Sequence, residues 1–485
     1  MMKKKILIYN WIPFDEREGK GGGVTVYTKN LIEYLIKDNS FEVYFLSSGR
    51  AYDRLTNDIY IEKTSNIYEG ACHSYQVVNS PVLSSGHLSF PYPEDMLHDK
   101  KMKKIIKQFL IDIGLVDVIH FQNLEGLSIN VLELKNDFPN TRFVYSVHNY
   151  YPFCPQVMLW TKDNYACKVK ECGRCCVDCV PLDVFKEKVI FNQQIVFDRE
   201  HNRKILPETI KSQKEMEEEF ALKSASRRLS DEEVDKLQKA FCEYRKTNVV
   251  YINKYMDIVL AVSKRVSDLA VGFGIEKEKI QVSYIGTKIA ENQVMHPANI
   301  YTGKGKFTIC YLGYMRHNKG FYFLMDALER LPDVLAKRMK VVFATQVEDQ
   351  QVKERLKCLE NKFDEICIYS GYTHEELPKI LKEVNLGIVC PLWEDNLPQV
   401  AIEMKAFGIA VLCSDKGGAQ ELSESKDFVF EAGNVDDFIA KLTKIINCEV
   451  TLESYYEKGM TLVTMDEHIK ELKRIYYNLL SRVLG

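Results

Sequence analysis

Two series of short apolar strands, separated by amphipathic helices, constrain the fold of this chain more than any other feature. In the first series the apolar, β-branched runs lie at 6–10, 42–47, 117–122, 142–148 and 257–263. In the second they lie at 307–313, 340–345, 365–370, 385–390 and 409–414. Helical patterns fall between them, as at 23–35, 320–331, 375–383 and 398–407. This alternation indicates parallel, doubly wound sheets, and two series predict two Rossmann-like domains of the α/β class.

Breaks in the alternation predict the domain boundaries. Residues 291–306 are mostly polar, contain proline and glycine and lack periodicity, which favours a linker between domains at 1–290 and 307–465. Residues 466–485 have the spacing of a closing amphipathic helix. Residues 155–248 are first cysteine-rich and then densely charged, which predicts an inserted helical subdomain or a surface elaboration without chemistry. Ligands bind outside the carboxyl ends of parallel strands, so two facing sheets predict a site in the cleft between them.

Composition limits the class of protein. The chain has 485 residues, of which 46% are hydrophobic and 27% charged, as in soluble globular proteins. A net charge of -3 argues against a nucleic-acid partner. The basic start MMKKK is not followed by a signal-peptide pattern, and we see no apolar run of about 18 residues, so we expect a cytoplasmic protein.

Glycine and basic residues follow the first strand of each expected domain. The loop GKGGG ends at Gly22 and Gly23, where backbone N–H groups and a helix N-terminus could meet a phosphate, although a flexible loop is the alternative. The patterns of dinucleotide-binding and P-loop proteins are not met. In the second domain Gly313 precedes Arg316 and Lys319, two cations that could bind a diphosphate or could be solvated surface charges.

An acidic turn and a helical acid follow the strand at 385–390. Pro398 suits the first turn of a helix, and Asp395 and Asn396 stand where capping residues belong. Glu403 falls inside the otherwise apolar helix. A buried carboxylate needs a cation or hydroxyl donors, and the adjacent hydroxyls of a ribose would satisfy it.

The order of these segments resembles the retaining nucleotide-sugar glycosyltransferases of family four, which have the GT-B architecture. The resemblance rests on GGVTVYTKNL, SVHNYYPFCP, DIVLAVSKRVSDLAVGFGIEKEKIQVSYIG, LGYMRHNKG, GYTHEELPKILKEVNLGIVCPLWEDNLPQVAIEMKAFG and SDKGGAQEL. It covers nearly the whole chain except the middle of the insertion. It implies two Rossmann-like domains facing a cleft, a donor-binding second domain and an acceptor-binding first domain.

The resemblance also implies roles for particular residues, as follows. Gly22 and Gly23 would lie near the donor phosphate or the acceptor, and Lys319 would hold the diphosphate. Glu403 would bind the ribose, and Gly371 and Tyr372 would border the nucleobase. His148 would approach the transferred sugar, which Asp395 and the backbone of Asn396, Leu397 and Pro398 would also meet. His148, Asp395 and Glu403 are thus the expected catalytic residues. From its residue type alone, His148 is equally an ordinary core or strand-edge histidine.

Two positions depart from the family pattern. Tyr314 stands where the family often has arginine after the glycine, and Arg316 is the candidate replacement. The E-x7-E pattern appears as Asp395-x7-Glu403, with Glu394 one residue too early. The implied reaction is front-face transfer with retention at the anomeric carbon, in which the leaving diphosphate takes the acceptor's proton. No cofactor is expected for it.

Five cysteines crowd into a short segment at Cys167, Cys172, Cys175, Cys176 and Cys179. Four thiolates, those of Cys167, Cys172, Cys175 and Cys179, could hold a structural zinc, and reduced thiols are the alternative.

The segment 98–114 has lysines around an apolar stripe. Such a helix could lie on anionic lipid at the cytoplasmic face of a membrane, or could pack its stripe on the first domain.

The expected function is transfer of a sugar from a nucleotide-sugar donor to a glycan or lipid-linked acceptor, in the synthesis of cell-surface polysaccharide or glycoconjugate. The main alternative is a catalytically inactive GT-B protein that binds a nucleotide sugar or glycan. A phosphorylase or an epimerase of similar fold is a further alternative.

Overall fold

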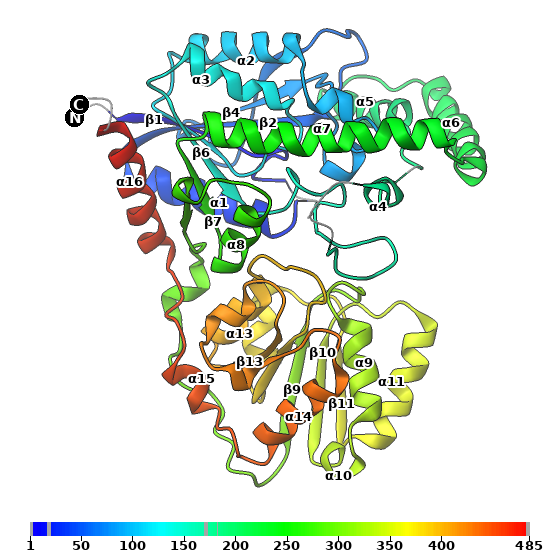
Figure 1. Ribbon diagram of the computed structural model, residues 1–485, viewed down its shortest axis with the longest axis vertical. Coiled ribbons are helices and arrows are strands. Elements are labelled where there is room, and N and C mark those ends of the chain that lie inside the picture. The colour runs from blue at the N-terminus through cyan, green and yellow to red at the C-terminus, as the bar shows by residue number, and fades with distance from the viewer. Residues whose placement is uncertain (1–2, 17–20, 169–172, 182, 482–485) are drawn as a thin grey trace.

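The computed structural model describes residues 3–16, 21–168, 173–181 and 183–481. Within them the chain forms two parallel-sheet domains, which stand one above the other in Figure 1. This arrangement confirms the predicted α/β class with two Rossmann-like domains. None of the helices in the described ranges is long and apolar enough to span a lipid bilayer.

The N-terminal sheet has eight strands in the order β3-β4-β2-β1-β5-β6-β7-β8. The strands are β1 (Lys4–Tyr9), β2 (Phe41–Ala51), β3 (Tyr60–Thr64), β4 (Cys72–Val78), β5 (Val118–Phe121), β6 (Arg142–Val147), β7 (Ile258–Ala261) and β8 (Ile280–Val282). The edge pair of β3 and β4 is antiparallel and the other neighbours are parallel. Because all strands from β1 to β8 except β3 run the same way, the loops after them meet at one edge of the sheet.

The helices of this domain are α1 (Gly22–Asp38), α2 (Lys100–Asp112), α3 (Leu134–Asp137), α4 (Arg174–Asp178), α5 (Lys186–Glu200), α6 (Pro207–Ser226), α7 (Asp231–Tyr255) and α8 (Lys264–Gly272). Helices α4 to α7 all fall between β6 and β7, in the segment where an insertion is expected. The long helix α7 crosses the upper domain in Figure 1, and α6 projects at its far end. Ser230 and Glu233 form a reciprocal cap at the start of α7.

The C-terminal sheet has six parallel strands in the order β11-β10-β9-β12-β13-β14. They are β9 (Phe307–Leu312), β10 (Met339–Ala344), β11 (Glu365–Tyr369), β12 (Leu386–Val389), β13 (Ala410–Ser414) and β14 (Val429–Phe430). The helices around them are α9 (Phe321–Arg330), α10 (Asp333–Ala336), α11 (Gln350–Lys362), α12 (Leu377–Ile380), α13 (Gln399–Ala406), α14 (Val435–Ile446) and α15 (Glu453–Glu457). Strands β9, β12 and β13 are buried along their whole length, as their continuous apolar runs predict.

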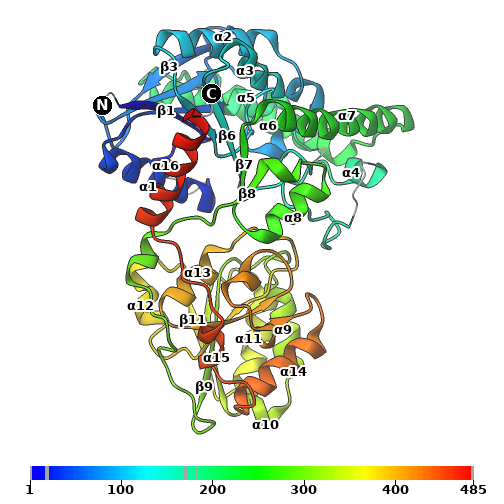
Figure 2. The same cartoon turned by 60° about the vertical axis from the view of Figure 1, so that its left-hand side comes forward.

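The last helix, α16 (Met465–Ser481), returns from the C-terminal domain to the N-terminal one. It runs beside α1 in Figures 1 and 2, and its buried side chains share a core with those of α1 and β1. From α16 this core includes Ile469, Leu472, Ile475, Tyr476 and Leu479. The chain therefore crosses between the domains twice, which ties their relative position to two segments.

Candidate active site

A cavity of about 580 Å³ lies between the carboxyl edges of the two sheets. It brings together eleven of the predicted site residues, namely Gly23, His148, Gly313, Lys319, Gly371, Tyr372, Asp395, Asn396, Leu397, Pro398 and Glu403. Gly22 stands beside it at the start of α1. Arg316 does not line the cavity: it is exposed, and its guanidinium lies over the Tyr314 ring with its Cζ 5.0 Å from the ring centre.

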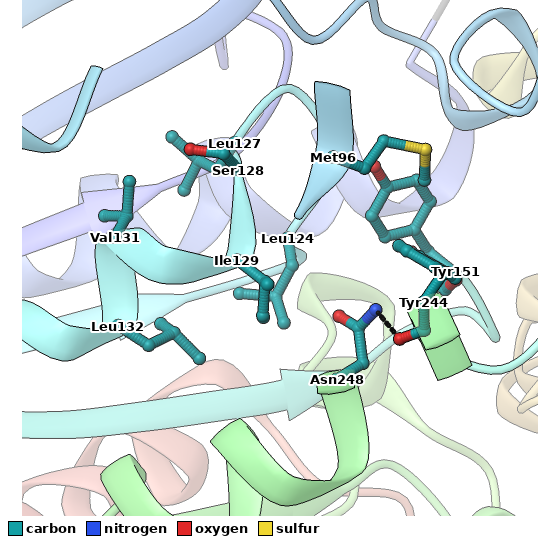
Figure 3. Close-up of a pocket in the computed structure, with 10 residues that line it drawn as sticks. All are labelled: Met96, Leu124, Leu127, Ser128, Ile129, Val131, Leu132, Tyr151, Tyr244 and Asn248. Carbon is teal, nitrogen blue, oxygen red and sulfur yellow. Dashed lines mark hydrogen bonds between the residues drawn. The ribbon is translucent and has the colours of Figure 1, made fainter. Parts of the chain in front are cut away.

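A second, much smaller cavity lies inside the N-terminal domain and is shown in Figure 3. Its volume is about 10 Å³, and most of its lining is apolar, with Leu124, Leu127 and Val131 on one side. The amide of Asn248 at its margin donates to the backbone carbonyl of Tyr244 at 2.8 Å. This cavity is a small packing gap of the core and is not a candidate site.

The acidic turn before α13 holds two buried carboxylates that point to different partners. Asp395 Oδ2 lies 2.6 Å from Nζ of Lys319, and both side chains line the cavity. The carboxylate of Glu394 instead meets the guanidinium of Arg265, with Nε 2.8 Å from Oε2. A buried charge is costly unless it is paired, so each acid of this turn has a cation.

The structure does not show the capping role that Asp395 and Asn396 could have had. Helix α13 begins at Gln399 after Pro398, and no side chain accepts a hydrogen bond at its N-terminus. Because Asp395 pairs with Lys319 across the loop after β9, it faces the cavity instead of the helix.

Glu403 is a buried acid in α13, only 6% exposed. Its Oε1 lies 3.2 Å from Nδ1 of His374, whose pKa is raised by this hydrogen bond. A basic side chain thus stands beside this buried carboxylate, and the contact is an ion pair when His374 is protonated. His374 itself is exposed, so a ligand at Glu403 could displace it.

The N-terminal side of the cavity is built from neutral groups. Nε2 of His148 lies 2.9 Å from Oε1 of Gln122, and the ring of Tyr27 stands 4.9 Å from that of His148. The hydroxyl of Tyr27 is in turn 2.7 Å from Nε2 of His468 on α16. Burial, with a smaller contribution from His468, lowers the pKa of His148 to about 3. His148 is therefore uncharged at neutral pH.

The glycine loop meets the donor side of the cavity directly. Nε2 of Gln399, the first residue of α13, donates to the carbonyl of Gly23 at 3.2 Å. A Cβ added at Gly23 would lie 3.2 Å from that carboxamide, so glycine permits the close approach. The two walls of the cleft are in contact at this point.

Sequence reasoning missed three residues of this region: Tyr27, Arg265 and His374. Each follows the carboxyl end of a parallel strand, after β1, β7 and β11 respectively. The same rule that located the loops could have selected them. All three fall within segments that carry the family resemblance, but their partners come from distant parts of the chain.

The structure supports the packing interpretation of the basic segment 98–114. In α2 the apolar stripe, Met102, Ile106, Phe109 and Leu110, is buried in the core of the N-terminal domain. Lys103 and Lys107 pair with Glu133 and Asp137. The stripe is therefore not available to enter a lipid layer, and Lys100, Lys101 and Lys104 remain exposed.

The expected zinc ligands are only partly described. Cys167, Cys175 and Cys179 are half-buried free thiols, whereas Cys172 lies outside the described residues. Burial raises the pKa of Cys175, and the nearby thiols of Cys176, Cys167 and Cys179 raise it further. Among the residues that the structure describes, no three His, Cys, Asp or Glu side chains are arranged to hold a metal. The zinc set, which includes Cys172, stays a prediction.

Comparison with known proteins agrees with the fold. Residues 297–461, which cover most of the C-terminal domain, match the family described as Glycosyl transferases group 1. No curated protein matches the chain in sequence.

Several solved structures share the fold over the whole chain. A glycosyltransferase from Rickettsia africae is 16% identical, with 99% of each chain covered and a TM-score of 0.55. Sucrose-phosphate synthase from Thermosynechococcus elongatus is 15% identical, with 99% of this chain and 100% of that one covered and a TM-score of 0.54. HepE of Anabaena, in complex with UDP, is 12% identical, with 98% and 100% covered and a TM-score of 0.53. The architecture is thus the GT-B fold of glycosyltransferases, with a group 1 domain in its C-terminal half.

Proposed function

We propose that this protein is a retaining glycosyltransferase that moves a sugar from a nucleotide-sugar donor to a glycan or lipid-linked acceptor. One observation carries the proposal: a single cavity holds Lys319 with Asp395, Glu403 and His148, supplied by both domains. Lys319 offers a point charge for a diphosphate. Glu403 offers a buried acceptor for two adjacent hydroxyls of a ribose. The nucleobase would lie toward Gly371 and Tyr372.

The proposed reaction takes place on one face of the sugar. The bond between the anomeric carbon and the diphosphate oxygen breaks, the acceptor oxygen bonds to the same carbon from the same face, and the acceptor's proton passes to the leaving diphosphate. Protein groups position the substrates and stabilise charge. His148, being neutral, would hydrogen-bond the transferred sugar without adding a charge next to the anomeric carbon. No metal or cofactor is assigned to these steps.

The acceptor is proposed to be a growing glycan or a lipid-linked sugar of cell-surface polysaccharide or glycoconjugate synthesis at the cytoplasmic face of a membrane. For membrane contact we propose the exposed lysines of α2, Lys100, Lys101 and Lys104, which would meet anionic headgroups electrostatically. Co-sedimentation with anionic vesicles at low salt tests this contact, and no binding would exclude it.

The donor is tested first by thermal shift with UDP-, GDP- and ADP-sugars. UDP-sugars are the first choice because HepE, of similar fold, was solved with UDP and with UDP-glucose. A stabilising sugar nucleotide is then incubated with a glycan or lipid acceptor, and the anomeric configuration of the product is read by NMR. Retention supports the proposal. Inversion would exclude the front-face mechanism, and binding without any turnover, even of donor hydrolysis, would favour the inactive binding protein.

A further inference from the structure

Helix α8 of the N-terminal domain docks its first residues on the acidic turn of the C-terminal domain. Arg265 donates two hydrogen bonds to the carboxylate of Glu394, from Nε to Oε2 at 2.8 Å and from Nη2 to Oε1. Oγ of Ser263, the residue before the helix, donates to the backbone carbonyl of Asn396 at 2.9 Å. The turn that carries Asp395 is therefore held from the opposite domain at two points.

Glu394 also binds the next glycine loop of its own domain. Its Oε2 accepts the backbone N–H of Gly417 at 3.1 Å, and the N–H of Gly418 donates to the carbonyl of Asp395 at 2.9 Å. Gly417 has φ +72°, and a Cβ there would lie 1.8 Å from the Asp395 carbonyl oxygen. The turn 393–398 and the loop 415–418 thus form one close-packed unit, and whatever fixes Glu394 fixes both.

The two neighbouring acids of the turn are held by cations from different domains. Arg265 belongs to the N-terminal domain, whereas Lys319, which lies 2.6 Å from Asp395, belongs to the C-terminal domain. Glu394 and Asp395 are adjacent residues of one turn, in which the N–H of Asp395 donates to the carbonyl of Trp393 at 2.9 Å, so fixing Glu394 restricts the backbone that sets where Asp395 points. Glu394 is 7% exposed and Asp395 is 8% exposed.

A second acid makes this contact specific for the closed cleft. Glu421 of the C-terminal domain accepts the backbone N–H groups of Lys264 and Arg265 at 2.9 and 2.7 Å. It also accepts the hydroxyl of Tyr284 at 2.7 Å. If the domains separated, α8 would lose this carboxylate at its N-terminus, and Glu394 would lose Arg265. Removing one partner of a buried ion pair is strongly unfavourable, so closed docking and an ordered turn stabilise each other.

We propose that Arg265 is a positioning residue that couples closure of the cleft to the placement of Asp395 at the donor sugar. The inference rests on the proposed function, since Asp395 has a sugar to meet only in a transferase. Arg265 does not line the cavity and acts through Glu394. In the proposed function the nucleotide half of the donor would meet Gly371 and Glu403, which bond to neither Arg265 nor Glu394, and Lys319, which reaches the turn only through Asp395.

The test combines a measurement that needs no substrate with one that does. Hydrogen–deuterium exchange is followed in the full chain over peptides containing 393–398 and 417–418, for wild type, Arg265→Ala, Arg265→Lys and Glu394→Gln. We expect faster exchange in these peptides in all three variants. The amide of Asp395 donates to the carbonyl of Trp393 and that of Gly418 to the carbonyl of Asp395, and both bonds lie in the turn and loop that Glu394 joins. Arg355→Ala is the matched control, since Arg355 grips Glu329 and Asp326 within one domain.

Transfer kinetics and nucleotide binding then separate positioning from binding. Misplacing Asp395 is expected to lower kcat about 100-fold in Arg265→Ala. The Kd for UDP, or for whichever nucleoside diphosphate stabilises the wild type, should change less than about 3-fold. Guanidinium ion added to Arg265→Ala should restore part of kcat, and ammonium ion should not, because only guanidinium can bond both carboxylate oxygens.

Unchanged exchange at 393–398 with kcat within about 2-fold of wild type would overturn the positioning role. Loss of nucleotide affinity in parallel with kcat would equally overturn it, since Arg265 would then act on the fold of the donor domain. A wild type that binds no sugar nucleotide would refute the proposed function. The exchange result would still decide whether Arg265 orders the turn.

Discussion

The two walls of the cleft satisfy their buried polar groups in opposite ways. The C-terminal wall places basic side chains beside its acids, with Lys319 beside Asp395 and His374 beside Glu403. The N-terminal side relies on burial instead, which lowers the pKa of His148 at the cleft to about 3 and raises the pKa of Glu125, in the interior of the same domain, to about 7. A charged wall suits a diphosphate and a ribose, whereas a neutral wall positions a sugar hydroxyl without adding charge.

The difference has a structural origin. On the C-terminal side the acids stand in a turn and on a helix face that borders the open cavity, where ligand or solvent can reach them. On the N-terminal side Glu125 lies beneath the surface, where it accepts the backbone N–H of Gly86 and the amide of Asn149. Burial dominates there and favours the uncharged form of both acids and bases.

The largest effect is expected on the neutral wall, from His148→Ala. Loss of a fixed hydrogen-bonding group at the reacting sugar should lower turnover about 100-fold. Donor affinity should change much less, because the proposed nucleotide contacts lie on the opposite wall. Transfer kinetics and calorimetry with the donor measure the two effects. His73→Ala is the control, since His73 lies on β4 away from the cavity. An equal fall in affinity would place His148 in donor binding.

The next effect is expected on the charged wall, from Glu403→Gln. Replacing charge-assisted bonds to two ribose hydroxyls by neutral ones should weaken the donor about 10- to 100-fold. Calorimetry with the sugar nucleotide measures this change, and turnover at saturating donor should be less affected. Glu360→Gln, an exposed glutamate on α11, is the control. Donor binding as tight as in wild type would show that the ribose assignment is wrong.

The fold and the place of the site followed from the sequence because both depend on local patterns. The buried strands β9, β12 and β13 read as continuous apolar runs, and the loops after parallel strands necessarily share an edge. Strand β3 was not predicted, since it is a half-exposed edge strand with no buried residue. Strand β14, at two residues, is too short for any pattern.

The pairing of charges could not be predicted from the sequence. Spacing favoured Asp395 over Glu394 as the acid that faces the sugar, and it is Asp395 that lines the cavity. The partner of Glu394, however, is Arg265 in the other domain, and the partner of Glu403 is an exposed histidine. Such contacts depend on how distant segments of the chain meet in the fold. They produce no hydrophobic periodicity in either segment, so the sequence does not predict them.

A pH-dependent effect on stability should come from Glu125. Burial raises its pKa from 4.5 to about 7, so the fold favours the protonated acid. The stability contribution is complete below pH 4.5 and is lost as the pH rises through 7, by up to about 3 kcal/mol. Glu125→Gln removes this dependence. The thermal midpoint of the variant minus that of wild type should therefore increase by about 5 °C between pH 5 and pH 8.

Glu360→Gln, at an exposed position on α11, should follow wild type at every pH. If the difference between Glu125→Gln and wild type stayed constant from pH 5 to pH 8, burial would not raise the pKa of Glu125 in the folded chain.

The smallest effect on catalysis is expected from the cysteine segment of the N-terminal domain. The chain a few residues before this segment contacts the other domain, where the amide of Asn318 donates to the sulfur of Met158 at 3.5 Å. We predict about one structural zinc per chain, held by Cys167, Cys172, Cys175 and Cys179. Metal analysis should show it in wild type and in Cys358→Ser, whose thiol is exposed on α11, and should show its loss in Cys179→Ser. Because the zinc would stabilise the segment without contacting the substrates, kcat per folded molecule should change little when the zinc is lost. A folded wild type without stoichiometric zinc would leave reduced thiols as the state of this segment.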